Sequence, residues 1–265
     1  MKINDSDYYN FHWKQKAGSL QNDPAMIEKI DLVLNHMPSD VKTIIDIGCG
    51  DGAITNELAK YYQVTAIDIS KEAIKHLSPN IKSFVANAAK VPLKDNYADL
   101  VFTSEMLEHV PENEYNQVLT ELKRLSRKYI FVSVPNDEKL RKRFTHCVSC
   151  HHEFHLYNHF RSFNLSILQK IFKDSKPTYS EVCGVLEKPS FNYISFLRNK
   201  LGRSYFFVSS MTMRCPICGN ILKPLSRYFW HRIINFSLLS LQKVLISILN
   251  KKSQPDWLLV LFEKN

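Results

Sequence analysis

The chain has 265 residues, of which 45% are hydrophobic, and it carries a formal net charge of +9. This length fits one α/β domain with additions or two small domains, and the composition is that of a globular protein. No run of 18 apolar residues occurs, which argues against a membrane span. The N-terminus lacks the apolar segment of a secretion signal, so we expect a cytoplasmic protein. The positive charge suits an anionic partner such as RNA, a phosphorylated metabolite or a lipid surface.

The segment 41–62, VKTIIDIGCGDGAITNELAKYY, combines an apolar run with closely spaced glycines. Its first part, Val41 to Ile47, is rich in β-branched residues and predicts a buried parallel strand. Glycines follow at positions 48, 50 and 52, and an amphipathic helix is expected from near Ala53. Glycine permits a tight turn and a close approach of the backbone to a ligand. The segment therefore predicts a ligand-binding turn between strand and helix.

A second predicted strand, Val64 to Ile67, ends in Asp68, where a carboxylate can accept two hydrogen bonds from ribose hydroxyls. The glycine spacing is G-x-G-x-G, whereas the dinucleotide fingerprint is G-x-G-x-x-G. Asp46 precedes the first glycine by two residues, and an acid there faces a positively charged ligand better than a pyrophosphate. An NAD-binding Rossmann protein, or a glycine turn without a ligand, is the alternative interpretation.

The stretch DIGCGDG resembles motif I of the class I S-adenosylmethionine-dependent methyltransferases. The resemblance covers roughly residues 41–186 and a final strand at the C-terminus. It implies S-adenosylmethionine as the cofactor. Asn87 stands where the family usually has an Asp that contacts the adenine amino group, and its side-chain oxygen can accept the same hydrogen bond. The expected cofactor contacts are Asp46, Gly48, Gly50, Gly52, Asp68, Ile69, Asn87, Ala88 and Ser104.

Further apolar runs complete the predicted sheet. They end near Ala86 and cover Asp99 to Thr103, Tyr129 to Val134, Thr178 to Leu186 and 256–262. Strands that alternate with helices predict a doubly wound, Rossmann-like sheet with its ligand at the carboxyl ends of the strands. The family's last strand is antiparallel, so the resemblance implies a seven-stranded sheet of this kind.

The motif E-x-x-E-H follows the fourth predicted strand as Glu105, Glu108 and His109. On a helical turn, positions i, i+3 and i+4 share one face, so these side chains are expected to converge. Two carboxylates and an imidazole are suitable ligands for a divalent cation. The alternative is that the glutamate caps the helix while the histidine packs beside the cofactor, without any metal.

The stretch EMLEHV resembles the ubiquinone-pathway O-methyltransferases. The small-RNA 2′-O-methyltransferases use E-x-x-E-H with a later histidine to bind a metal that grips the substrate hydroxyls. His159 in the segment Asn158 to Phe163 is similar to that later motif and is the candidate fourth ligand. The pattern H-x-R-x-F at 159–163 is also common in methyltransferases of bacterial glycan and lipid pathways. For a reaction without metal, the candidate bases are His109, His155 and His159.

Two C-x-x-C pairs, Cys147 with Cys150 and Cys215 with Cys218, form a ligand set typical of tetrahedral zinc. Their separation exceeds that of a single zinc ribbon, so a shared metal must join two insertions. With four thiolates bound it has no open position and is structural. His151 or His152 could replace one cysteine, and a redox pair or four unrelated core cysteines are the alternatives. Cys49 and Cys183 are expected to be packing residues.

Two apolar segments flank this core. Residues 226–250 predict a helix that covers the sheet, forms a homodimer, or lies on a membrane as an interfacial helix. Near the N-terminus, Tyr8, Tyr9, Phe11 and Trp13 predict a lid over the cofactor or substrate.

These predictions combine into an α/β methyltransferase with a zinc-linked substrate cap. We expect a helical lid in 1–40, a core in 41–186 and 256–265, and cap insertions at 140–163 and 187–255. The expected reaction is O-methylation of a small molecule, a glycan or a lipid-linked sugar. The alternatives are an RNA 2′-O-methyltransferase, although no known RNA-binding module is visible, and a non-catalytic binding protein of the same fold.

Overall fold

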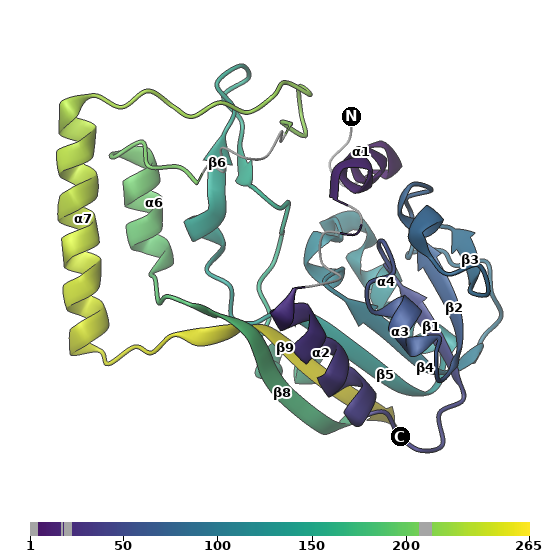
Figure 1. Cartoon of the computed structure of the whole chain (residues 1–265). Coiled ribbons are helices and arrows are strands. Elements are labelled where there is room, and N and C mark those ends of the chain that lie inside the picture. The colour runs from purple at the N-terminus through teal and green to yellow at the C-terminus, as the bar shows by residue number, and fades with distance from the viewer. Residues whose placement is uncertain (1–4, 17, 19–22, 207–213) are drawn as a thin grey trace.

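The computed structural model describes residues 5–16, 18, 23–206 and 214–265 (Figure 1). Its main feature is a seven-stranded sheet in the order β3-β2-β1-β4-β5-β9-β8. Strands β1 to β5 are parallel, whereas β9 runs antiparallel to both β5 and β8. This confirms the expected seven-stranded Rossmann-like sheet. The strands are β1 Thr43–Ile47, β2 Gln63–Asp68, β3 Lys82–Val85, β4 Ala98–Ser104, β5 Ser126–Pro135, β8 Ser175–Glu187 and β9 Gln254–Lys264.

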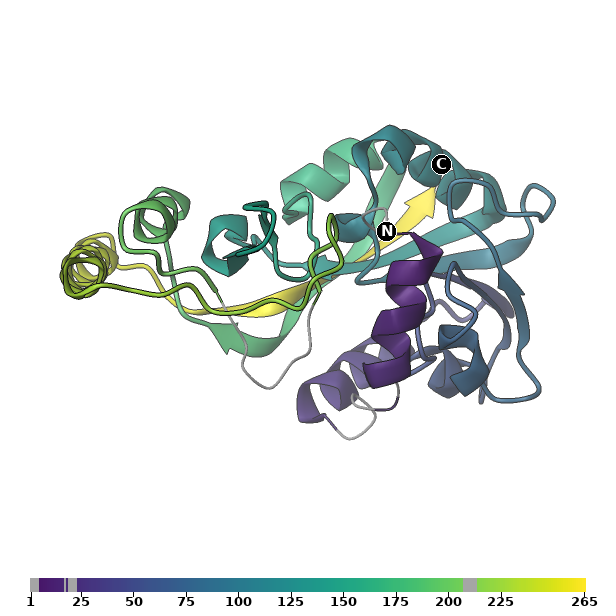
Figure 2. The ribbon, with the colours of Figure 1, turned by 90° about the horizontal axis from the view of Figure 1, so that it is seen from above.

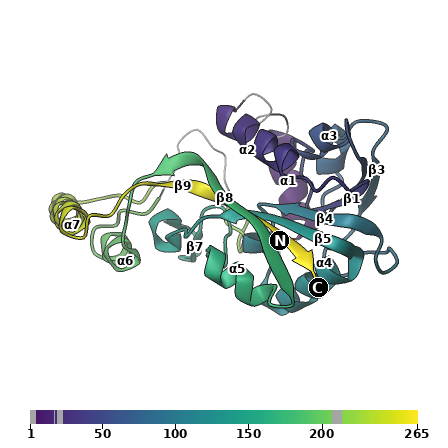
Figure 3. The ribbon, with the colours of Figure 1, turned by 90° about the horizontal axis from the view of Figure 1, so that it is seen from below.

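Helices cover both faces of the sheet, as Figure 3 shows. Adjacent residues of a strand point to opposite faces, so Ile44 and Ile45 of β1 enter two different hydrophobic clusters. One cluster packs against α4 and α5, and the other packs against α2 and α3. Burial on both faces explains why the central strands are almost continuously apolar. These helices are α2 Pro24–Asn35, α3 Thr55–Leu58, α4 Glu112–Leu125 and α5 Leu165–Ile171.

A helix follows the glycine turn, as predicted. The amphipathic pattern places its start near Ala53, and α3 covers Thr55–Leu58. The chain leaves the helix by Ala59 and enters β2 at Gln63. Elsewhere the helix signals hold: the Asn164 side chain caps α5 by accepting the Ile167 N–H at 2.9 Å.

The first helix, α1 Ser6–Lys16, lies over the carboxyl ends of the parallel strands (Figure 1). Asn10 Oδ1 fixes it by accepting a hydrogen bond from Ser70 Oγ at 2.8 Å and one from the Glu72 N–H at 3.3 Å. Ser70 belongs to the loop after β2, so α1 is tied to the loop that carries Asp68. A short 3₁₀ helix, Ala73–His76, continues that loop.

The remaining elements form an extension beyond the β8–β9 end of the sheet, visible in Figures 1 and 2. A two-stranded sheet pairs β6 Phe144–His146 with β7 Glu153–His155 after the 3₁₀ helix Leu140–Arg143. Helices α6 Asn192–Lys200 and α7 Phe229–Ile248 lie between β8 and β9 in the sequence. Within the described residues, no helix is both long and apolar enough to cross a membrane.

Candidate functional site

A cavity of about 320 Å³ opens at the carboxyl ends of the parallel strands, beneath α1. Of the predicted cofactor residues, Gly48, Asp68, Ile69, Asn87 and Ala88 line it. Asp46, Gly50, Gly52 and Ser104 are not among its lining residues. From the predicted lid, Tyr8, Tyr9 and Trp13 line the cavity, together with His12. Phe11 points elsewhere, since its ring packs against the Arg214 guanidinium at 4.9 Å.

The glycine turn brings the backbone close to the cavity. Gly48 has φ of +79°, and its N–H donates to the Ile67 carbonyl at 2.8 Å. A Cβ atom at this position would lie 2.5 Å from Met106 Cγ. Both the left-handed conformation and the contact with Met106 therefore require glycine. This turn leaves open space next to Asp68 for a ligand.

Asp68 is held rigidly by its own neighbours. Its two carboxylate oxygens accept the N–H groups of Gly50 at 2.9 Å and Ser70 at 2.8 Å. Burial raises the pKa of Asp68, while these hydrogen bonds oppose the increase. A carboxylate oxygen has more than one acceptor site, so Asp68 can still receive hydroxyl groups from a ligand in the cavity.

Asp46 is buried, and only one of its two carboxylate oxygens has a hydrogen-bond partner within the described residues. Its Oδ2 accepts the Thr55 hydroxyl at 2.6 Å, whereas Oδ1 has no hydrogen-bond partner within the part of the chain that is described. Burial raises the pKa of Asp46 to about 7, with the Thr55 hydrogen bond opposing the increase. A positively charged ligand nearby would favour the carboxylate form.

Asn87 is braced by an acid that the sequence did not single out. Its Oδ1 accepts the Ala89 N–H at 2.8 Å, and its Nδ2 donates to Glu114 Oε2 at 3.0 Å. Glu114 comes from α4 and also lines the cavity. A carboxylate therefore stands beside the position where the resemblance expects an Asp, although it is supplied by another element.

Glu105 does not converge with the other two residues of its motif. It has φ of +52° and precedes the 3₁₀ helix Leu107–His109, so the three residues do not share one continuous helical turn. Its carboxylate accepts hydrogen bonds from the buried Lys29 Nζ at 3.1 Å and from Ser133 Oγ at 3.0 Å. The tertiary partner Lys29 thus holds the Glu105 carboxylate, which lines the same cavity as His109 but does not belong to the ligand group of Glu108 and His109.

Glu108, His109 and His159 do come together. Each offers one ligand atom, and these atoms all lie within 4.8 Å of one another. Glu108 is fully buried, and among the described residues neither of its carboxylate oxygens has a hydrogen-bond partner. Burial, followed by the nearby charge of Glu105, raises the pKa of Glu108 well above its ordinary value. Burial also lowers the pKa of His109, which keeps its imidazole neutral.

His159 also belongs to a second group, with Glu138 and His155. The sequence patterns did not indicate Glu138. Glu138 Oε2 lies 2.5 Å from His159 Nδ1, and Oε1 lies 3.3 Å from His155 Nε2. Burial tends to raise the pKa of Glu138, but the hydrogen bonds from His155 and His159 outweigh it, and the net pKa is lowered. In a neutral imidazole, a hydrogen bond to the Glu138 carboxylate places the proton of His159 on Nδ1 and the lone pair on Nε2. His109 and His159 line the cavity, whereas His155 is buried and is not among its lining residues.

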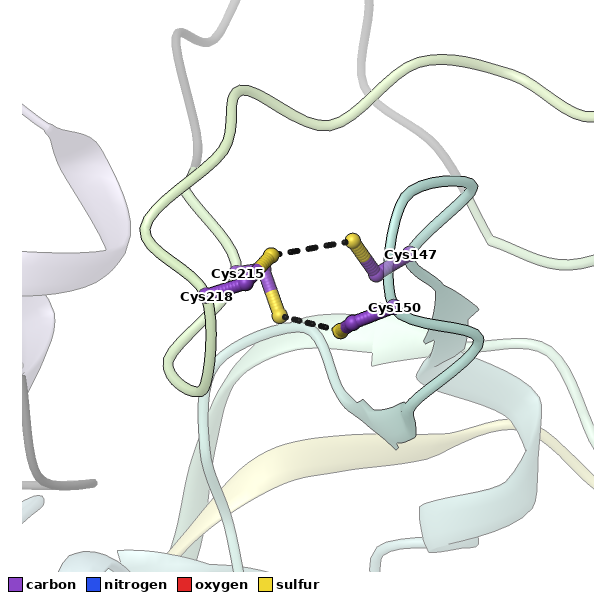
Figure 4. Close-up of side chains that lie close together, drawn as sticks. All are labelled: Cys147, Cys150, Cys215 and Cys218. Atoms are coloured by element: carbon purple, nitrogen blue, oxygen red, sulfur yellow. Dashed lines mark hydrogen bonds between the residues drawn. The ribbon is translucent and has the colours of Figure 1, made fainter.

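The four predicted cysteines also come together, as Figure 4 shows. The Sγ atoms of Cys147 and Cys218 lie 3.6 Å apart, as do those of Cys150 and Cys215. Thiolates on a tetrahedral zinc, with Zn–S bonds of about 2.3 Å, stand about 3.8 Å apart. All four Sγ atoms lie within 4.8 Å of one another, so the donor set and its size fit zinc.

The two cysteine knuckles have matching backbones. The N–H of His151 donates to the Cys147 carbonyl and the N–H of Gly219 donates to the Cys215 carbonyl, both at 2.9 Å. Gly219 has φ of +72° and His151 has φ of +58°. His151 thus serves as the turn residue of the first knuckle, and neither it nor His152 belongs to the four-residue group.

Residues 45–129 match a family model described as a methyltransferase domain. The chain is 32% identical over 124 residues to an uncharacterized protein of Methanocaldococcus jannaschii, covering 45% of this chain and 53% of that protein. It is 35% identical over 98 residues to a ubiquinone biosynthesis O-methyltransferase of Nitrosomonas europaea, covering 34% of this chain and 41% of the relative. The chain thus spans about half or less of the curated relatives it matches.

Among solved structures, the N-methyltransferase NodS of Bradyrhizobium japonicum, in complex with S-adenosyl-L-homocysteine, is 16% identical with a TM-score of 0.55. That likeness covers 68% of this chain and 93% of NodS. The strand order, the family match and this structural likeness agree. The chain has the fold of the class I S-adenosylmethionine-dependent methyltransferases.

Proposed function

We propose that the protein transfers a methyl group from S-adenosylmethionine to a hydroxyl of a small molecule, a glycan or a lipid-linked sugar. The observation that carries this proposal is a shared cavity. Gly48 and Asp68, which suit the cofactor, line the same space as His109 and His159, which suit proton transfer. A cofactor site without an adjacent base would instead favour a binding protein.

The residues of the cavity fit S-adenosylmethionine. Asp68 would receive the ribose hydroxyls, and Asn87 and Glu114 would face the adenine. Asp46 does not line the cavity and would act on the positively charged part of the ligand only through its charge. Bound S-adenosylmethionine supplies an electrophilic methyl group. The aromatic lid residues Tyr8 and Trp13 would exclude water from the cavity. Catalysis then depends on holding the acceptor oxygen in line with that methyl group.

His159 is the base that this geometry favours. Glu138 would hold a proton on Nδ1 of the neutral imidazole, so that Nε2 would be free to take the proton of the acceptor hydroxyl. After transfer, Glu138 stabilises the imidazolium, as a carboxylate does in a catalytic triad. His155 fixes the same carboxylate from its other oxygen.

A metal-assisted variant is favoured by one observation. The buried carboxylate of Glu108 has no hydrogen-bond partner among the described residues and lies beside His109 and His159. Such an orphaned group fits a divalent cation. A cation there would lower the pKa of a bound acceptor hydroxyl. Glu108, His109 and His159 would hold it, while Glu105 stays with Lys29.

We also propose that Cys147, Cys150, Cys215 and Cys218 hold a structural zinc. The sulfur separations and the paired knuckles support it. The knuckle residue Arg214 packs on Phe11 of α1, so this centre touches the helix that covers the cavity. The zinc would therefore help to position the lid as well as the extension.

Calorimetry tests the cofactor assignment. We expect S-adenosylmethionine to bind with micromolar affinity, about −7 to −8 kcal/mol. Asp68→Ala should weaken binding about 10- to 100-fold, because the ribose hydrogen bonds are lost. Binding of NAD without a response to S-adenosylmethionine would refute the assignment.

A methyl-transfer assay with sugars, nucleotide sugars, catechols, polyprenyl glycans and short RNA tests the reaction. His159→Ala should reduce the rate at least about 100-fold and leave cofactor affinity unchanged. His76→Ala, which alters an exposed histidine, is the matched control. If a cation is used, chelation should abolish the rate and Glu108→Gln should resist rescue by added metal. Activity on RNA alone would move the proposal to RNA 2′-O-methylation.

A further inference from the structure

Helix α7 exposes large apolar side chains to solvent. Phe229 is 75% exposed, Phe236 71% and Ile248 71%, and the intervening Trp230, Ile233, Leu241 and Val244 are also exposed. The helix has 20 residues, which makes it about 30 Å long. Scattered surface hydrophobics are ordinary, but seven large apolar side chains exposed along one helix of this length indicate an interaction surface.

The exposed residues lie on one side of the helix. At 3.6 residues per turn, Phe229, Trp230, Ile233, Phe236, Leu241, Val244 and Ile248 fall within an arc of about 140°. Arg232 and Lys243 lie together along one border of this arc, at about the same angle around the axis. An apolar face with basic residues at its border is the pattern of a helix that lies in a membrane interface.

The opposite side of α7 is already occupied. Asn235 Oδ1 accepts a hydrogen bond from Arg198 Nε of α6 at 2.8 Å, and Gln242 is buried on the same side. Gly202, just after α6, lies so close to Asn235 that an added Cβ would be 3.2 Å from the Asn235 Cβ. Contact with α6 therefore fixes which face of α7 turns outward, and Figures 1 and 2 show this pair at the edge of the molecule farthest from β3.

Charge identifies the kind of partner. Residues 188–255 contain 11 Lys and Arg and no Asp or Glu. The other 197 residues contain 24 Lys and Arg against 26 Asp and Glu, so the whole positive excess of the protein lies in this one segment. A second copy of the same segment would be repelled by it. An anionic surface would attract it, by about 1 kcal/mol per basic residue at the membrane surface.

We propose that α7 is an interfacial helix that docks the protein on an anionic lipid bilayer, with its apolar face in the headgroup region and its basic residues on the lipid phosphates. Nucleic acid would also attract the charge, but it offers no apolar environment for the aliphatic side chains of Ile233, Leu241 and Ile248. The inference does not rest on methyl transfer, since lipid binding is measured without the reaction. If both hold, the enzyme would work beside a lipid-linked acceptor.

Vesicle flotation tests the proposal on the full chain. One set of vesicles is phosphatidylcholine alone, and the other contains phosphatidylcholine with an equal part of phosphatidylglycerol. We expect the protein to float with the anionic set only, and to be released by high salt because screening removes the attraction. The double variant Trp230→Glu, Phe236→Glu should bind at least about tenfold more weakly.

Both substituted residues are exposed, so the fold should tolerate the changes. Unchanged melting temperature and zinc content would verify this. Tyr61→Glu, an exposed aromatic residue of the sheet domain, is the matched control and should float like the wild type. Equal binding by the double variant, equal binding to neutral vesicles, or no vesicle binding would each overturn the proposal. If vesicles were not bound, a dimer that the double variant dissociates would assign α7 to self-association. Retention of RNA would then assign the basic residues to nucleic acid.

Discussion

The sheet domain and the segment 188–255 use their charged and apolar residues in opposite ways. The sheet domain buries its apolar residues on both faces of the sheet, and the chain outside 188–255 is close to neutral. Gly48, Asp68, His109 and His159 line its cavity. The segment 188–255 is uniformly basic and leaves apolar residues of α7 on the outside. One region surrounds a cavity, and the other presents apolar and basic side chains to solvent.

The sheet domain also differs from the whole extension, which includes β6 and β7, in what holds it together. The sheet domain has two extensive hydrophobic clusters, whereas the extension has a small one formed by Cys147, Phe154, Leu156, Cys215 and Leu222. A core of that size supplies little folding free energy, and small folded units of this kind usually need a metal or disulfides. The comparison therefore predicts that the extension depends on zinc and the sheet does not.

Zinc removal should give the largest effect. Structural zinc sites contribute about 10–16 kcal/mol of binding free energy, which here is coupled to folding of the extension. Cys215→Ser should lose zinc by elemental analysis and become susceptible to proteolysis within 188–255, while the sheet domain stays resistant. Cys183→Ala, outside the four-cysteine group, should keep its zinc. A metal-free protein with unchanged protease resistance would contradict the prediction that the extension depends on zinc.

Glu138→Gln should come next, since it tests the chemistry of the cavity. Glutamine cannot stabilise a protonated His159, so we expect methyl transfer to slow about 100-fold, or about 3 kcal/mol in activation free energy. Cofactor affinity should not change. Glu153→Gln removes a carboxylate that binds Lys200 outside the cavity and should leave the rate intact. A full rate in Glu138→Gln would remove this residue from the mechanism.

Asp46→Asn tests the cost of a buried acid without its ligand. Burial raises the pKa of Asp46 to about 7, so the folded state binds this proton more tightly than the unfolded chain does. Ionisation therefore costs stability, with no cost below about pH 4 and the full cost above about pH 7. Asp46→Asn should stabilise the ligand-free protein at about pH 8, by about 2 kcal/mol, and less at about pH 5.

Asp99→Asn is the control with the opposite sign. Burial tends to raise the pKa of Asp99, but hydrogen bonds from Thr43 and Lys42 outweigh it and lower the pKa. Its carboxylate stabilises the fold above the ordinary pKa of an acid, and this is lost as the pH falls. The substitution should therefore destabilise the protein at neutral pH. Thermal melting of both variants at both pH values measures these effects. If both variants showed the same pH dependence of stability, the opposite pKa shifts assigned to Asp46 and Asp99 would be wrong.

The smallest effect should come from Asn87→Ala. One neutral hydrogen bond to the ligand is lost, which is worth about 1 kcal/mol, or about fivefold in affinity for S-adenosylmethionine. Glu114→Gln should weaken binding to a similar extent if Glu114 supplies the charge that Asn87 lacks. Calorimetry on both variants decides between these residues. If neither substitution changed the affinity, the adenine would have to bind elsewhere in the cavity.

The sequence by itself determined the features that depend on neighbours in the chain. The stretch DIGCGDG predicted the glycine turn because strand, glycines and helix follow one another, and the apolar runs predicted the strands because burial on both faces requires them. The two C-x-x-C pairs indicated zinc ligands because the residue types and the short spacing within each pair suffice for a knuckle.

Only the tertiary structure decided which distant side chains meet. Glu138 and His159 are 21 residues apart, with a 3₁₀ helix and the paired strands β6 and β7 between them, and no periodic pattern connects them. Glu105 leaves its motif because Lys29, 76 residues away, offers a buried positive charge, and Glu114 joins Asn87 from another element. The pattern of α7 permitted a covering helix, a dimer or a membrane helix, because hydrophobic periodicity shows an apolar face but not what lies against it. Packing on α6 turned that face outward, since the Arg198–Asn235 contact occupies the other side.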